Sequence, residues 1–152
     1  MTERAPEITD RDVYITRAFD APRDVVWKFF TEPELIATWF GPQLFRVPVE
    51  SVAVDPRVGG EYRLTMVGVD TGEPAPMEGR ITAIEPPEYL EIVIGTYAGE
   101  DDLDEVVLRL TFHDHGAKTR VTLHQGPFSP EHRRMTETGW GESFVKLDAL
   151  LP

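Results

Sequence analysis

The chain has 152 residues with 27 acidic and 15 basic side chains, and its net charge of −12 disfavours nucleic acid and anionic membrane surfaces as partners. It contains no cysteine, which excludes disulfides and thiolate chemistry and is typical of a reducing compartment, so we expect a cytoplasmic protein. The N-terminal sequence has no apolar signal region, and no segment approaches the ~18 apolar residues of a membrane span.

A polar stretch opens the chain and is followed by an alternating segment. Residues 1–11 are polar or charged without apolar periodicity, which predicts a flexible lead-in. Residues 12–152 fit a single domain, because a chain of this length can bury one sizeable core. Within that domain, Asp12 to Asp20 alternates in polarity as a strand does, and Pro22 follows its end.

Two short helices are predicted after this strand. Pro22 suits the first position of the first helix. Thr31, with Glu34 three residues later, has the pattern of a capping box that begins the second helix, and Gly41 ends it. The apolar residues at helical spacing are Val26, Phe29 and Phe30 in the first helix and Leu35, Ile36, Trp39 and Phe40 in the second.

Between Val47 and Gln125 the apolar residues recur with a period of two, which indicates about six consecutive antiparallel strands, the first of them in "VESVAV". One face of this sheet is apolar and the other is charged, so we expect one covered and one solvated face. Turns are predicted at 55–60, 70–76, 85–88 and 113–118. The predicted inward residues include Tyr62, Leu64, Met66, Val106, Leu108, Leu110, Phe112, Val121 and Leu123, and the outward ones include Glu61, Arg63, Arg109 and Arg120.

A long C-terminal helix is the only candidate to cover the apolar face. Ser129 is expected to cap it, with Pro130 at its first position. Gly139 and Gly141 are costly inside a helix, so they indicate a close contact or a space left open. The apolar stripe of this helix comprises Trp140, Phe144, Leu147 and Leu151.

Four segments together resemble the activator of heat-shock-protein-90 ATPase homologue family, which belongs to the START-like, birch-pollen-allergen-like superfamily. They are "TEPELIATWFGP", "DPRVGGEYRLTM", "EGRITAIEPPEYLEIVI" and "GWGESFVKLDALL", and the resemblance runs from Tyr14 to Leu151. It implies an α+β helix-grip fold, in which a curved antiparallel sheet of about seven strands surrounds a long C-terminal helix and two short helices follow the first strand. Many superfamily members enclose a hydrophobic cavity between sheet and helix.

Such a cavity would be closed at its open end by the aromatic residues of the short helices. Trp39 and Phe40 are expected at this rim, with Phe45 entering from the following loop. Small-molecule sites usually enclose roughly 300 to 1,000 Å³. A collapsed core, in which the same side chains pack against one another, is the alternative that the pattern leaves open. The predicted ligand-binding residues are Trp39, Phe40, Phe45, Tyr62, Met66, Ile81, Ile92, Leu108, Trp140 and Phe144.

The histidines suggest neither a metal site nor a general base. His113 and His115 lie two residues apart, but a pair of ligands without a third makes a poor site, so we interpret them as part of a solvated turn and predict no metal. His124 alternates out of phase with its apolar neighbours and is expected on the solvated face, and His132 is expected on an exposed helical turn. No catalytic or cofactor motif occurs, so no catalytic residue or cofactor is assigned.

The acidic residues are also interpreted as surface groups. Burial of Glu78 would raise its pKa and suit it to proton transfer, but the strand phase sends Glu78 and Arg80 outward as a surface pair. The acidic stretch 99–105 lacks the glycine and terminal glutamate of an EF-hand loop, which favours a solvated hairpin tip over a calcium site.

Three hypotheses for the function follow. The first is a START-like domain that binds a hydrophobic or amphipathic small molecule. The second is an accessory protein for a heat-shock-protein-90 chaperone, as the family name suggests. The third is a cyclase- or aromatase-like enzyme, which would need a buried polar set of Tyr62, Glu78 and Arg80 and which the strand phase disfavours. A homodimer is compatible with a domain of this size, although no pattern locates an interface.

Overall fold

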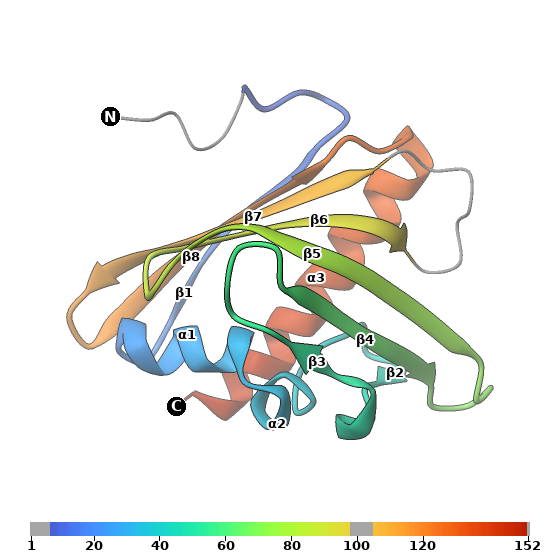
Figure 1. The fold of residues 1–152 in the computed structure, drawn as a ribbon, viewed down its shortest axis with the longest axis horizontal. Helices are drawn as coiled ribbons and strands as arrows, with labels where there is room; N and C mark the ends of the chain where they lie inside the picture. The colour runs from blue at the N-terminus through green and yellow to red at the C-terminus, as the bar shows by residue number, and fades with distance from the viewer. Residues whose placement is uncertain (1–6, 98–104, 152) are drawn as a thin grey trace.

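The computed structural model describes residues 7–97 and 105–151. Its eight strands form one antiparallel sheet that curves around a long C-terminal helix, and two short helices lie at one end of that helix (Figure 1). The helix-grip fold is thereby confirmed. The strands follow the order β1-β8-β7-β6-β5-β4-β2 across the sheet, and β3 also pairs with β4. The elements are β1 Val13–Phe19, α1 Arg23–Thr31, α2 Pro33–Ile36, β2 Phe45–Arg46, the 3-10 turn η1 Val49–Ser51, β3 Ala53–Val54, β4 Glu61–Gly68, β5 Pro74–Glu85, β6 Tyr89–Tyr97, β7 Val106–His115, β8 Lys118–Gly126 and α3 Pro130–Leu150.

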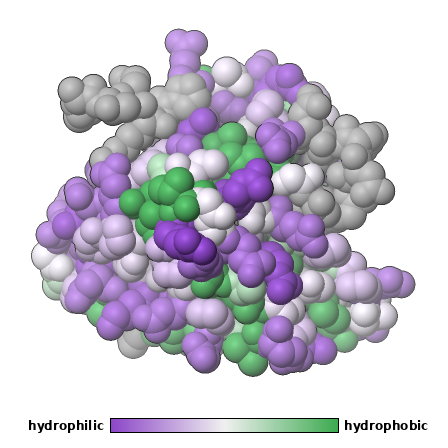
Figure 2. Space-filling model, viewed as in Figure 1, coloured by the Kyte–Doolittle hydropathy of each residue, from purple (hydrophilic) through white to green (hydrophobic). Residues whose placement is uncertain are grey.

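The alternation of side chains gives the sheet one buried and one more exposed face, as expected. In β4, Tyr62, Leu64 and Met66 are buried while Glu61 and Arg63 are exposed. The face turned away from α3 is mainly hydrophilic, with a few separate hydrophobic spots (Figures 1 and 2). The buried face carries the other predicted inward residues, namely Val106, Leu108, Leu110, Phe112, Val121 and Leu123.

The helix α3 covers the buried face. Ser129 caps it, because the Ser129 hydroxyl accepts a hydrogen bond from the His132 backbone N–H (3.3 Å), and Pro130 is its first residue. Both features agree with the sequence analysis. The predicted apolar stripe is buried against the sheet and comprises Trp140, Phe144, Leu147 and Leu151.

The predicted starts of the short helices are wrong by one residue, and α2 ends at Ile36 instead of continuing to Gly41. Pro22 is extended (φ −63°, ψ 158°) and therefore precedes α1 as its cap instead of forming its first turn. The capping box is not formed: Thr31 ends α1, and its hydroxyl donates to the Trp27 carbonyl (3.0 Å). The reason is Pro33, since a residue before proline avoids helical geometry, and Glu32 is accordingly the extended cap of α2.

Three boundaries in the sheet also differ from the predictions. The turn expected at 113–118 is shorter, because β7 extends to His115 and β8 begins at Lys118. The segment "VESVAV" is not one strand, because the Ser51 hydroxyl accepts the Thr65 backbone N–H (3.1 Å) and donates to the Pro48 carbonyl (2.7 Å), which produces the turn η1 before the short β3. The loop predicted at 70–76 ends early, since β5 begins at Pro74. Proline is tolerated there because Pro74 is the first residue of the strand.

Candidate ligand site

An aromatic cluster joins the short helices to α3. Trp39 lies just after α2 and is only 1% exposed. Its Nε1 donates to the Phe29 carbonyl (2.8 Å), and its ring centroid lies 4.8 Å from that of Phe30 and 5.4 Å from that of Phe40. Trp39 is therefore a fixed core residue, and the next residue, Phe40, faces the hollow described below.

Trp140 forms the other side of this cluster. Its ring meets Phe40 edge to face at 5.3 Å, and its Nε1 donates to the buried Gln125 Oε1 (2.7 Å). An indole held by both a ring contact and a hydrogen bond has little rotational freedom. The aromatic wall formed by Phe40 and Trp140 is therefore preformed.

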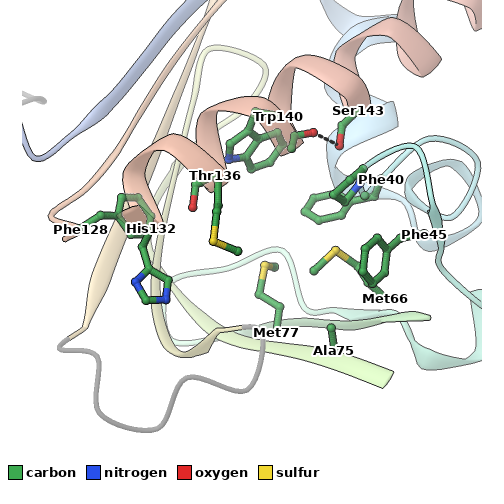
Figure 3. Close-up of a pocket in the computed structure, with 14 residues that line it drawn as sticks. Phe40, Phe45, Met66, Ala75, Met77, Phe128, His132, Thr136, Trp140 and Ser143 are labelled. Atoms are coloured by element: carbon green, nitrogen blue, oxygen red, sulfur yellow. Dashed lines mark hydrogen bonds between the residues drawn. The ribbon is translucent and has the colours of Figure 1, made fainter. Parts of the chain in front are cut away.

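A hollow of about 180 Å³ lies beside this wall, between α3, β4 and β5. Met66 and Met77 project into it from the sheet, with Ala75 beneath, while His132 and Phe45 lie at opposite ends (Figure 3). Most of the lining is apolar, and Ser143 turns its hydroxyl to the Gly139 carbonyl (2.9 Å). The lining residues are Phe40, Gly41, Pro42, Phe45, Met66, Ala75, Met77, Phe128, His132, Met135, Thr136, Gly139, Trp140 and Ser143.

The segment from Gly41 to Phe45 is held against α3 by polar contacts. Lys146 Nζ donates to the carbonyls of Pro42 (3.0 Å) and Phe45 (2.9 Å). Glu142 Oε1 accepts the Gln43 backbone N–H (3.0 Å). Burial lowers the pKa of Lys146, and the nearby Glu142 partly offsets this. These contacts place one wall of the hollow.

Glycine is favoured at two points of the same contact. Gly41 has a φ of +105°, which other residues rarely adopt, and it turns the chain after Phe40. At Gly139, an added Cβ would lie 3.3 Å from Pro42 Cγ, so this glycine lets the loop approach α3 closely. Gly141 has no atom within 4 Å of such a Cβ and therefore leaves open space.

The structure divides the ten predicted ligand-binding residues into two groups. Phe40, Phe45, Met66 and Trp140 line the hollow. The other six are packed in the core and are at most 1% exposed: Trp39, Tyr62, Ile81, Ile92, Leu108 and Phe144. The Tyr62 hydroxyl donates to the Phe30 carbonyl (2.6 Å), and burial raises the pKa of Tyr62.

Several residues that line the hollow were not predicted from the sequence. Met77 alternates in phase with Ile81, so strand phase placed it on the inner face without indicating a hollow. His132, Met135 and Thr136 lie on the first turns of α3, outside the apolar stripe, and Met135 is 63% exposed. No sequence signal marks them, because the hollow extends past the buried stripe.

The polar candidates do not form a site with the hollow. Glu78 and Arg80 are exposed on the outer face, as predicted. His132 is half-buried at the hollow, not exposed as expected. Within residues 7–97 and 105–151, no group of three or more His, Asp or Glu side chains could hold a metal ion. The acidic stretch 99–105 lies outside the described residues except for Glu105.

The prediction of a solvent-exposed His124 is wrong. Its phase does point it away from α3, but its side chain is only 4% exposed. His124 Nε2 lies 3.0 Å from Asp12 Oδ2, and its ring packs edge to face with Tyr14 at 6.4 Å. The start of the domain thus covers this part of the outer face, which the alternation of β8 alone could not indicate.

Comparisons with known proteins agree with this architecture. The profile of the family described as "Activator of Hsp90 ATPase homolog 1-like protein" matches residues 20–152. No curated protein matches the chain. A Chromobacterium violaceum crystal structure is similar with a TM-score of 0.82 and 21% identity, covering 94% of this chain and 98% of the other.

Two further solved structures are similar over nearly the whole chain. The AHSA1 protein from Silicibacter pomeroyi gives a TM-score of 0.80 at 24% identity, covering 92% of this chain and 96% of that one. A Mycobacterium smegmatis protein gives a TM-score of 0.79 at 27% identity, covering 99% of this chain and 96% of that one. In the part of the chain that the structure describes, none of the helices combines the length and apolarity needed to cross a bilayer.

Proposed function

We propose a function for this chain as a member of the family of Activator of Hsp90 ATPase homolog 1-like proteins, and so of the START-like superfamily. The chain binds the apolar part of a small hydrophobic or amphipathic molecule beneath α3. The observation that carries this proposal is the apolar hollow beside Phe40 and Trp140. The adjoining core is closely packed, with Phe30, Trp39 and Phe144 almost fully buried. An apolar hollow next to such packing supports a binding role.

The size of the hollow limits the part of a ligand that it can enclose. Its volume of about 180 Å³ is below the usual range for whole small-molecule sites. An engineered apolar cavity of ~150 Å³ binds benzene. We therefore expect one aromatic ring or a short branched alkyl group inside, with the rest of the ligand outside.

The lining favours adaptable apolar contacts over a single fixed shape. Met66, Met77 and Met135 contribute flexible, polarisable thioethers. Phe40 and Trp140 supply a rigid aromatic wall on which a ring can pack. This combination supports a carrier or sensor that accepts related apolar groups.

The two other hypotheses have less support. A chaperone-accessory role is favoured only by the family description, and stimulation of the ATPase of a heat-shock-protein-90 chaperone would test it. The enzyme hypothesis needs Tyr62, Glu78 and Arg80 together, but the Tyr62 hydroxyl is in the core while Glu78 and Arg80 lie on the outer face. We therefore do not propose catalysis at that set.

The proposal is tested first by native mass spectrometry of the protein as purified, followed by denaturing extraction of any bound lipophile. Toluene is then titrated by ligand-observed NMR. Ala75→Phe places a ring in the hollow, whereas Val69→Phe adds the same ring at an exposed position outside it. We expect saturable toluene binding that Ala75→Phe abolishes and Val69→Phe preserves. Equal binding in both variants, or no binding by the parent, would contradict the proposal.

A further inference from the structure

A second hollow lies on the outer face of the sheet, away from α3. It encloses about 410 Å³ over the neighbouring strands β1, β8 and β7, which run side by side in Figure 1. Polar side chains from all three strands line it, and the chain before β1 closes one side. The lining residues are Glu7, Ile8, Tyr14, Arg109, Thr111, His113, Arg120, Thr122 and His124.

The register of β7 with β8 arranges the polar residues in three cross-strand pairs. These pairs are Arg109 with His124, Thr111 with Thr122, and His113 with Arg120. The two arginines therefore lie at opposite ends of a central pair of threonines. The outer pairs are four positions apart along a strand, which corresponds to ~13 Å between them.

One donor at this hollow lacks an acceptor. Arg109 Nε is buried without a hydrogen-bond partner among the described residues. Glu91 Oε1 lies 3.6 Å from Arg109 Nε, which is an ion pair but is beyond hydrogen-bond distance. The carboxylate of Glu91 already accepts hydrogen bonds from the hydroxyls of Tyr89 (2.7 Å) and Thr82 (2.8 Å). Buried donors without acceptors are costly, so an external acceptor would be favoured here.

The lining of the hollow carries two arginines, Arg109 and Arg120, against one carboxylate, Glu7, although the chain as a whole is acidic. Arg120 has no carboxylate within ion-pair distance in residues 7–97 and 105–151. Burial and the nearby Arg120 lower the pKa of His113, so its ring is neutral near pH 7, and its Nε2 lies 3.2 Å from Thr122 Oγ1. The acidic groups facing the site are Glu7, Glu91 and Asp12, the last of which is paired with His124.

We propose that this outer hollow, with Arg109 and Arg120 at its ends and Thr122 between them, binds a small molecule through a phosphate-type oxyanion. Guanidinium groups match such oxyanions with paired hydrogen bonds, and threonine hydroxyls add further donors. The net charge of −12 disfavours a polyanion such as nucleic acid and restricts the ligand to a small anion. The site lies on the opposite face of the sheet from the hollow beneath α3, so it does not depend on the function proposed above.

Inorganic phosphate is the probe, titrated at neutral pH and constant ionic strength while backbone amides are followed by NMR. We expect saturable shifts at Thr111 and Thr122. Arg120→Gln removes one charged donor and is expected to weaken phosphate binding about tenfold. Arg63→Gln is the matched control, because Arg63 is exposed on the outer face of β4 and pairs with Glu61 (2.8 Å).

Two further variants keep the test independent of a loss of folding. Glu7→Gln removes a carboxylate from the lining and is expected to tighten phosphate binding. Thr122→Val retains the net charge and is expected to weaken phosphate binding. The proposal is overturned if chloride produces the same shifts, if the shifts do not saturate, or if Arg63→Gln weakens binding as much as Arg120→Gln does.

Discussion

At the scale of single residues, Lys146 holds a wall of the hollow in place. Its side chain is half-buried and its ammonium group donates to two carbonyls of the segment from Gly41 to Phe45. Charged donors form stronger hydrogen bonds than neutral ones, so this one side chain restrains a segment that otherwise has few backbone bonds.

We expect Lys146→Met to lower the free energy of unfolding by about 1 kcal/mol, because the carbonyls of Pro42 and Phe45 lose their donor. The affinity for toluene is expected to fall as well, since the wall containing Phe45 is released. Urea unfolding and ligand-observed NMR measure the two effects. Lys28→Met is the control, because Lys28 is exposed on α1. A variant with unchanged affinity would show that Lys146 does not position the wall.

Asp12 gives the second residue-scale prediction, which concerns pH. Burial alone would raise the pKa of Asp12, but hydrogen bonds from Thr9 and the nearby His124 outweigh it and lower the pKa below its usual 3.8. The unfolded chain therefore takes up this proton at higher pH than the folded chain does. It follows that the free energy of unfolding falls as the pH drops from above 3.8 through the lower folded pKa.

Thermal unfolding in acidic buffers, compared between the parent and Asp12→Asn, measures this contribution. The variant cannot titrate at this position, so its stability should depend less steeply on pH in the same window. Equal slopes for the two proteins would mean that Asp12 has the same pKa folded and unfolded.

At the scale of elements, α3 provides a matched pair of glycines. Replacing glycine with alanine inside a helix usually stabilises by roughly 0.5 to 1 kcal/mol. Gly141→Ala should show this full gain, because nothing lies within 4 Å of the added Cβ. Gly139→Ala should gain less or lose stability, since the Cβ would lie 3.3 Å from Pro42 Cγ. Chemical denaturation distinguishes the two, and equal gains would show that the loop yields at no cost.

A helix boundary was predicted correctly where neighbouring residues carry one consistent signal, and wrongly where two local signals conflict. The cap of α3 was predicted correctly because Ser129 and Pro130 carry the whole signal in adjacent residues. The start of α2 was not, because Thr31 matches a capping box whereas Pro33 requires an extended residue directly before it. Steric exclusion by proline decided that position over a favourable hydrogen bond.

At the scale of the whole molecule, strand phase predicted the inner face but not the hollow. Leu108 and Met66 both face inward, yet Leu108 is closed in by neighbours and Met66 borders open space. That difference depends on where α3 crosses the curved sheet and where the Gly41 turn brings Phe45. The alternation of side chains along a strand indicates neither the crossing of α3 nor the position of Phe45. Core residues and lining residues were therefore predicted as one set.

The structure predicts that members of that set behave differently on truncation. Leu108→Ala removes a fully packed side chain and should lower the free energy of unfolding by about 2 to 5 kcal/mol. Phe45→Ala removes a half-buried ring and should cost about 1 kcal/mol. Toluene affinity should show the reverse order, because Phe45 borders the hollow and Leu108 does not.

Urea unfolding and ligand-observed NMR on both variants measure these effects, with toluene binding taken below the unfolding transition so that the folded protein alone is compared. Loss of affinity in Phe45→Ala with little loss of stability would assign the ring to binding. A large loss of stability in Phe45→Ala, with unchanged affinity, would instead mean that the ring closes the core and that the ligand enters elsewhere along α3.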